Sequence, residues 1–155
     1  MRTNLSILAA QPFFKGMSQG QLELLAADCY PAEFKPGERI LNEDGTANRF
    51  YLIQEGEVEL ETTVQAGETV HIETLKAGDL LGWSWLFPPY CWHFDARAVT
   101  AAKALCFYGT HVRELCEANH ELGYELMKRV AETVIKRLQA TRHEMADHHL
   151  HARPM

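Results

Sequence analysis

Glycine recurs at near-regular intervals through the first half of the chain, and this spacing constrains the fold more than any other feature. The glycines at positions 37, 45, 56, 67 and 78 separate short runs that are rich in β-branched and aromatic residues. Turn signals about every 8–12 residues are typical of antiparallel sandwiches and rolls, and a mostly helical chain would not show them. We therefore expect a mainly β fold with flanking helices.

The runs between these glycines carry strand patterns. Residues 57–64 alternate charged and apolar side chains with period two, which is typical of a strand with one buried face. Further strands are expected at 30–34, 39–41, 49–54 and 69–75. Many short strands of this kind predict a jelly-roll (double-stranded β-helix) barrel.

Helical patterns lie on both sides of the β region. Ser18 is suited to cap a short helix, because its hydroxyl can accept a backbone N–H of the first turn. Thr110 can cap another short helix, and a longer one follows from about His120. The expected organisation is an N-terminal helical segment at 1–29, a β-roll at 30–109, C-terminal helices at 110–146 and a disordered tail at 147–155.

The last helix carries an apolar stripe made of Leu122, Leu126, Val130, Val134 and Leu138. A helix of about 25 residues is about 37 Å long, which is longer than one small roll can cover. The stripe therefore predicts a homodimer through the C-terminal helix. The alternative is that the stripe packs only on its own roll.

The net charge and the length of the chain limit which partners it is expected to bind. The 155 residues carry a formal net charge of −6, which gives no general attraction to nucleic acid. We expect no direct DNA binding, because the chain leaves no room for a winged helix-turn-helix; a transcription factor would need DNA-binding residues supplied elsewhere. No signal peptide or membrane span is visible, and the four cysteines form no CxxC pair, so a cytoplasmic protein with reduced thiols is expected.

Four segments resemble the cyclic-nucleotide-binding domains of the catabolite activator protein and fumarate–nitrate regulator superfamily. They are Phe-Lys-Pro-Gly-Glu at 34–38, Phe-Tyr-Leu-Ile-Gln-Glu-Gly-Glu-Val at 50–58, Leu-Lys-Ala-Gly-Asp-Leu-Leu-Gly at 75–82 and Ala-Val-Thr-Ala at 98–101. The resemblance covers residues 12–142. It implies a jelly roll whose long C-terminal helix pairs in dimers, and a ligand-sensing regulatory function.

The resemblance also implies a phosphate-binding cassette, here residues 82–97, which we name the cassette segment. In the family, backbone N–H groups and an arginine hold the cyclic phosphate, and a glutamate binds the ribose. This chain has Trp83 at the glutamate position. If Val99 and Ala101 align with the family's Val and Ala, Asp95 stands at the arginine position. Since a carboxylate repels a phosphate, the ordinary cAMP site is expected to be absent.

Arg97 could still provide an anion-binding site. Residues two apart on a strand share a face, so Arg97 is expected to point inward with Asp95. With the loop adjusted by two residues, it becomes the family's arginine itself. The alternative is that Arg97 pairs with Asp95 or Glu114, or that its side chain extends to the edge with its charge in water.

The cassette segment is also rich in aromatic residues. These rings could stack on a flat ligand, or Trp83 and Trp92 could fill the cavity themselves. His93 could donate a hydrogen bond to an anion. The candidate ligand-binding residues are Gly82, Trp83, Ser84, Trp85, Trp92, His93 and Arg97, and the candidate ligand is a small anionic or aromatic metabolite.

Metal and catalytic sites are not indicated. The possible ligands Cys106, His111, Cys116 and His120 are spread over several expected elements, whereas zinc ligands usually come in close pairs. No common catalytic motif is present. We expect no metal, no cofactor and no enzymatic activity. The favoured function is a regulatory ligand sensor, and the alternative is a ligand-free protein-interaction module with a self-filled pocket.

Overall fold

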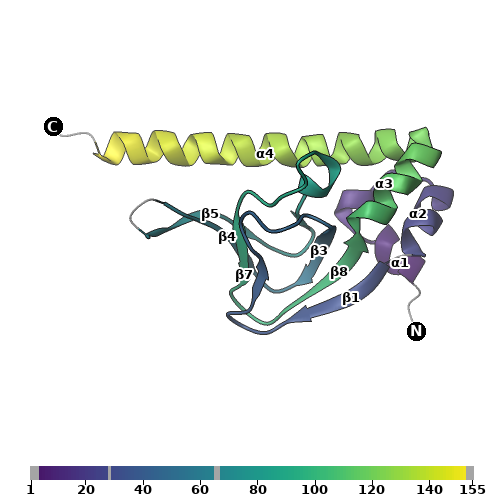
Figure 1. Cartoon of the computed structure of the whole chain (residues 1–155), viewed down its shortest axis with the longest axis horizontal. Helices are drawn as coiled ribbons and strands as arrows, with labels where there is room; N and C mark the ends of the chain where they lie inside the picture. The colour runs from purple at the N-terminus through teal and green to yellow at the C-terminus, as the bar shows by residue number, and fades with distance from the viewer. Residues whose placement is uncertain (1–3, 28, 65–66, 153–155) are drawn as a thin grey trace.

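The computed structural model describes residues 4–27, 29–64 and 67–152. Two four-stranded antiparallel sheets form a jelly roll, with short helices at the N-terminal end and a long C-terminal helix running along the roll (Figure 1). This confirms the expected fold class.

The first sheet has the strand order β1-β8-β3-β6, and the second has the order β2-β7-β4-β5. Every strand predicted from the turn spacing is present, with its ends shifted by at most one residue. The strands are β1 (Cys29–Phe34), β2 (Arg39–Leu41), β3 (Arg49–Glu55), β4 (Val58–Thr63), β5 (Thr69–Leu75), β6 (Leu80–Leu81), β7 (Asp95–Ala98) and β8 (Ala102–Tyr108).

The tight turn after β3 shows why glycine punctuates the chain. Gly56 has φ +91°, and a Cβ added to it would lie 2.4 Å from the carbonyl oxygen of Ala101. Only glycine fits such a left-handed conformation beside another backbone without strain. The spacing read from the sequence is therefore set by close strand-to-strand approaches.

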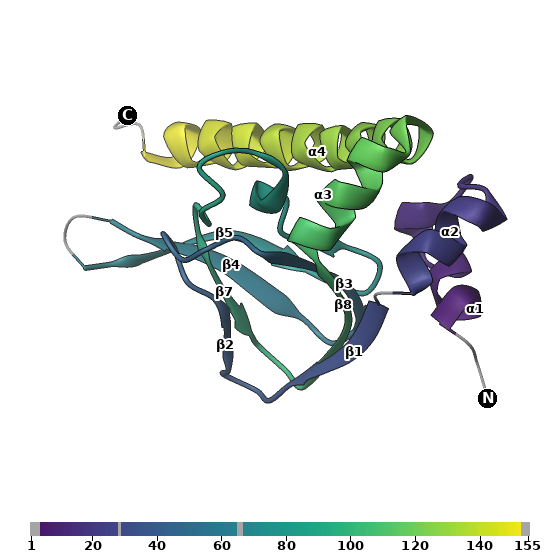
Figure 2. The ribbon, with the colours of Figure 1, turned by 45° about the vertical axis from the view of Figure 1, so that its right-hand side comes forward.

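The N-terminal helices pack against the first sheet (Figure 2). They are α1 (Asn4–Ala9), the 3₁₀ helix η1 (Pro12–Phe14) and α2 (Gln19–Ala26). Ser18 caps α2 as predicted: its Oγ accepts the backbone N–H of Gln21 at 3.2 Å, and the Gln21 side chain accepts the N–H of Ser18 at 3.0 Å. This reciprocal pair is a capping box.

The C-terminal helices are α3 (Gly109–Ala118) and α4 (His120–Ala152). Helix α3 begins one residue before the expected cap Thr110, and the residue at its N-cap, Tyr108, makes no side-chain capping bond. Helix α4 has 33 residues and extends past the roll (Figure 1), so the tail expected to be disordered is helical as far as Ala152. Residues 153–155 of that tail lie outside the described residues.

The buried side chains form two clusters on opposite sides of the first sheet. Strand β3 shows the division: Phe50 and Leu52 pack toward the helices, whereas Tyr51 and Ile53 point into the roll between the sheets. The period-two alternation of a strand produces this split. The roll interior and the helix-facing layer are therefore separate environments for a functional side chain.

Candidate functional site

The cassette segment leads from β6 through the 3₁₀ helix η2 (Ser84–Leu86) and a loop into β7. This stretch lies between the roll and helix α4, beside α3 (Figure 2). Its first residue follows a strand of the first sheet, and its last residues belong to the second. The segment therefore bridges the sheets directly beneath the long helix.

The indole of Trp92 lies against Gly82 at the beginning of the cassette segment. A Cβ added to Gly82 would be 2.7 Å from Cη2 of the ring. Trp92 is 3% exposed and belongs to the cluster inside the roll. The indole therefore fills the space on the inner side of the segment.

The indole of Trp83 is half-buried and faces helix α4. The guanidinium carbon of Arg137 lies 4.6 Å from the centroid of the Trp83 ring, which is a cation–π distance. The ring of Phe94 meets the same indole edge-on at 6.4 Å. Trp83 thus connects the cassette segment to the long helix.

Arg137 is a site residue that the sequence reasoning missed. It is 9% exposed, its Nε lies 3.1 Å from Oε2 of Glu73, and its Nη2 donates to the carbonyl oxygen of Leu80. Its Nη1 is buried and has no hydrogen-bond partner among the described residues. Burial lowers the pKa of Arg137 to about 10, although the charges of Glu73 and Asp79 oppose this shift.

One signal in the sequence could have indicated Arg137. It lies seven residues after Val130, in phase with the apolar stripe that begins at Leu122 and Leu126. These three apolar residues are buried against the body of the protein. A cation on the same helix face as a buried apolar stripe is itself buried, so it needs an anionic or hydrogen-bonding partner in the surface against which the stripe packs.

Ser84 and Trp85 lie on the helix side of the segment. Trp85 is buried and stacks on Phe50, with ring centroids 4.6 Å apart and planes inclined by 18°. Its Nε1 donates to the carbonyl oxygen of Gly82 at 3.2 Å. Trp85 therefore anchors the short helix η2 in the helix-facing core, away from Trp92.

His93 is exposed, between the buried Trp92 and Phe94. This alternation continues into β7, where Ala96 and Ala98 are buried inside the roll. The structure therefore brings Trp92 against Gly82, places Trp83 on the helix side, and leaves His93 exposed.

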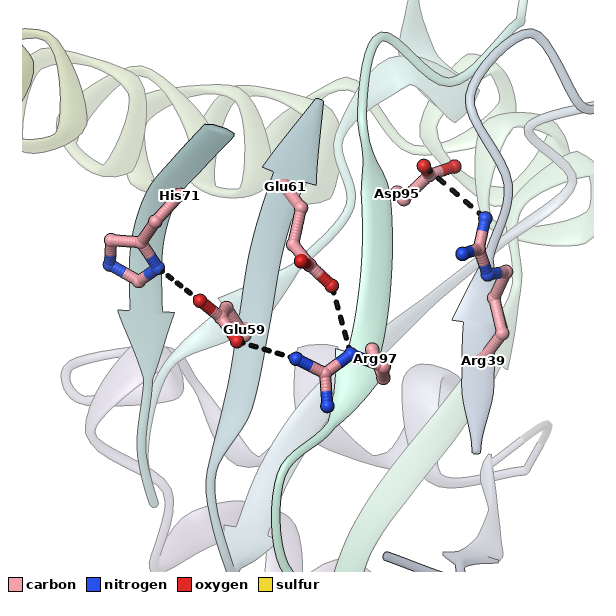
Figure 3. A network of polar contacts seen from close by, with 6 residues as sticks. All are labelled: Arg39, Glu59, Glu61, His71, Asp95 and Arg97. Carbon is pink, nitrogen blue, oxygen red and sulfur yellow. Dashed lines mark hydrogen bonds and ion pairs between the residues drawn. The ribbon is translucent and has the colours of Figure 1, made fainter. Parts of the chain in front are cut away.

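The expected inward direction of Arg97 is wrong. Arg97 lies on the outer face of the second sheet, where its Nη2 is 2.8 Å from Oε2 of Glu59 and its Nε is 3.0 Å from Oε1 of Glu61 (Figure 3). The predicted alternative partners, Asp95 and Glu114, are also not those observed. Because strand residues alternate sides, the burial of Ala96 and Ala98 places Arg97 outside.

Asp95 shares this outer face, so its expected place at an inner phosphate position is also wrong. Its carboxylate lies 3.3 Å from Nη1 of Arg39 and accepts the backbone N–H of Glu43 at 2.7 Å. At the other end of the row, Nδ1 of His71 lies 2.6 Å from Oε1 of Glu59 (Figure 3). The side chain that points inward at Gly82 is Trp92.

Among the residues that the structure describes, no three His, Cys, Asp or Glu side chains are grouped so that they could hold a metal ion. No described helix combines the length and the hydropathy needed to cross a membrane.

Comparison with known proteins agrees with this geometry. The sequence profile of the cyclic nucleotide-binding domain matches residues 31–119. A solved structure from Geobacter metallireducens GS-15, of a protein named for cyclic nucleotide binding, is 30% identical with a TM-score of 0.80, covering 89% of this chain and 99% of that one. The chain belongs to the cyclic nucleotide-binding domain family. It is thus a regulatory ligand-sensing module, of a class that is generally non-catalytic.

Two other solved structures are similar to the chain. A regulatory subunit of a cAMP-independent protein kinase A from Trypanosoma cruzi, bound to guanosine, is 26% identical with a TM-score of 0.66, covering 74% of this chain and 40% of that one. The catabolite activator protein of Thermus thermophilus is 20% identical with a TM-score of 0.70, covering 88% and 62%, and shows the shared fold. Among curated proteins no match was found.

Proposed function

We propose that this module does not bind cAMP or cGMP in the manner implied for the family, and that it senses a small flat or anionic metabolite instead. The observation that carries this proposal is the position of Trp92. Its indole is buried inside the roll and contacts Gly82, where the family's phosphate would approach the backbone. Because protein interiors are close-packed, a cyclic phosphate and this indole cannot share the same space.

The charges around the cassette segment support the same proposal. Phosphate recognition favours a guanidinium that offers two parallel N–H donors. Arg97, from the strand that carries this group in the family, points to the outer face and is held there by Glu59 and Glu61. At the position expected to bind the ribose, Trp83 offers a ring face in place of a carboxylate.

The ligand class follows from Trp83 and its neighbour. A half-buried indole beneath a guanidinium presents a flat apolar surface next to a positive charge. The relative from Trypanosoma cruzi, with guanosine bound, shows that a family member takes up a nucleoside, which has no phosphate. We therefore expect a nucleoside-like ring or an aromatic acid.

A thermal-shift panel followed by calorimetry tests this function. The panel contains cAMP, cGMP, guanosine, adenosine and simple aromatic acids, each at roughly 1 mM, and a ligand of the native state raises Tm by mass action. We expect no shift with cAMP or cGMP and a shift with a member of the other two groups. Saturable one-to-one uptake of cAMP or cGMP would overturn the proposal.

A ligand-free interaction module is the second candidate, because the roll interior around Gly82 is filled by the chain's own Trp92. On this hypothesis no compound of the panel raises Tm. Trp92→Ala separates the two candidates: a self-filled pocket loses stability and gains no ligand, whereas a sensor whose ligand contacts Trp83 keeps its response.

We further propose that the signal passes through a homodimer of α4 to a protein partner, without direct DNA binding. The stripe that was predicted to pair is divided: Leu122, Leu126 and Val130 pack on the chain's own body, as the alternative expected, and Leu138 is exposed. Leu138 lies with three other large apolar side chains, all between 43% and 66% exposed, on another face of α4: Tyr124, Met127 and Ile135. Tyr124, Ala131 and Leu138 are spaced seven residues apart, as in a coiled-coil seam. A second copy of α4 supplies the same pattern and covers this face.

A further inference from the structure

A crevice of about 280 Å³ opens between α4, η1 and the turn that joins β5 to β6. No residue of the cassette segment lines it, although it shares Arg137 with the site proposed above. Its apolar wall is formed by Pro12 and Phe13, and its charged lining from α4 consists of Arg129, Glu132, Lys136 and Arg137. One wall is thus suited to an apolar group and the other to charged groups.

Arg137 provides the buried cation of this crevice. Two of its nitrogens are used by Glu73 and by the carbonyl of Leu80, which both line the crevice. The third, Nη1, is buried and has no acceptor among the described residues. A buried N–H without an acceptor is costly, and in native structures such a group requires an explanation. A ligand oxygen in the crevice would supply the missing acceptor.

Two charged groups of the crevice wall are held by the protein itself. Asp79 accepts the backbone N–H of Lys76 at 2.8 Å and closes its own turn. Arg129 donates to Glu125 and, at 2.5 Å, to the carbonyl oxygen of Lys15. These contacts use both side chains in fixing the walls of the crevice.

Glu132 and Lys136 complete the charged lining. They are exposed, lie four residues apart on α4 and both face the crevice. Lys136 adds a cation next to Arg137, and Glu132 adds an anion one turn away. The crevice therefore offers a positive pole, a negative pole and an apolar wall.

We propose that this crevice binds a free α-amino acid with an apolar side chain. The carboxylate accepts hydrogen bonds from Arg137 and Lys136, the ammonium pairs with Glu132, and the side chain packs on Pro12 and Phe13. A volume of about 280 Å³ lies just below the roughly 300–1,000 Å³ of drug-sized sites, which suits a ligand as small as an amino acid. Because Arg137 also contacts Trp83, an occupied crevice would be coupled to the cassette segment.

Calorimetry on the full chain tests the site with leucine and two matched compounds. The first compound, 4-methylpentanoate, lacks only the amine, and the second, 3-methylbutylamine, lacks the carboxylate. We expect saturable binding of leucine and at least about tenfold weaker binding of each analogue, because each leaves one pole unpaired. No saturable heat with any of alanine, valine, leucine, methionine and phenylalanine would overturn the proposal.

Variants of the crevice test which residues bind the carboxylate and the ammonium of the amino acid. Glu132→Gln should weaken leucine about tenfold and leave 4-methylpentanoate unchanged, and Arg137→Met should abolish binding of both carboxylates. Lys128→Met, which removes a cation of α4 outside the crevice, is the matched control and should bind as wild type. If Arg137→Met does not fold, the exposed Glu132→Gln still decides: unchanged leucine affinity in this variant contradicts the proposal. Neither result depends on whether the cassette segment binds a nucleoside.

Discussion

Trp92 and Gly82 are packed so tightly that a single methyl group cannot be added between them without movement. The Cβ of an alanine at position 82 would lie 2.7 Å from Cη2 of the indole. Gly82 also has φ +97°, in the left-handed region that favours glycine. The turn that begins the cassette segment and the side chain that fills the roll beneath it therefore determine each other's position.

Gly82→Ala should lower the free energy of unfolding by about 2–6 kcal/mol, as the sum of backbone strain and overpacking. In a Trp92→Leu background the clash disappears, and the same change should cost about 1–3 kcal/mol. Urea denaturation of the four proteins in this cycle measures the coupling between the two positions.

Gly37→Ala is the control for backbone strain, because Gly37 has φ +84° and an added Cβ would meet nothing within 4 Å. It should cost about 1–3 kcal/mol in both backgrounds. Equal costs of Gly82→Ala with and without Trp92 would show that the indole does not restrict this turn.

Arg97→Gln should be mild, because the Arg97 side chain is 35% exposed and its ion pairs lie on the outer face. We expect a loss of about 0.5–1.5 kcal/mol, from two partly exposed pairs and the repulsion left between Glu59 and Glu61. The thermal shift produced by any compound of the panel should be unchanged. Arg39→Gln, on the same face, is the matched variant. A folded Arg97→Gln protein that loses its ligand response would restore the inward alternative.

The strands could be predicted from the sequence because local patterns determine them. Period-two alternation and glycine turns gave the ends of β1 to β5 within one residue. Which side chains of β7 point into the roll could not be predicted in the same way. Its inner residues Ala96 and Ala98 are only weakly apolar, and Val99, whose apolar side chain suggests a core position, is 40% exposed. The burial of Ala96 and Ala98 places Arg97 on the outer face, opposite Glu59 of β4, and this strand pairing joins segments far apart in the sequence.

The candidate site was partly predictable for a related reason. The sequence indicated Trp83 and Trp92 as candidate residues, and both side chains lie at the cassette segment. Arg137 lies 54 residues after Trp83 in the sequence. Its contact with the ring depends on where α4 crosses the roll, and this crossing results from the burial of Leu122, Leu126 and Val130. Long-range packing of this kind leaves no local signature.

Cys29 should resist alkylation in the native protein. Its thiol is buried, and this burial, followed by the nearby Cys106, raises the pKa of Cys29 to about 12. Since the thiolate is the reactive form, iodoacetamide at pH 8 should label the partly exposed Cys91 well before Cys29. Mass spectrometry of labelled peptides measures both rates. Labelling of Cys29 as fast as that of Cys91 would contradict the burial.

The same thiol should make the protein less stable at alkaline pH. The unfolded chain releases this proton near the ordinary thiol pKa of about 8.5, whereas the native state holds it to about 12. The native state binds more protons between these values, so the free energy of unfolding falls as pH rises from about 9 to 12. Urea denaturation at pH 8 and at roughly pH 10.5 should show a smaller fall for Cys29→Ala than for wild type. An equal fall in both proteins would assign the effect to other groups.

Disruption of the exposed face of α4 should produce a monomer. Ile135→Glu combined with Leu138→Glu places two carboxylates where a second helix would bury apolar side chains, and unpaired charges are costly to bury. Light scattering after gel filtration should give twice the chain mass of 17.6 kDa for wild type and the chain mass itself for the double variant. Gln139→Glu, next to this face, adds charge without entering it and should remain dimeric.

Because Leu122, Leu126 and Val130 pack on the opposite side of the helix, the variant monomer should keep its fold, with wild-type near-ultraviolet circular dichroism. A wild-type protein that elutes as a monomer at roughly 100 µM, far above the dissociation constant expected of an apolar two-helix seam, would refute pairing through α4.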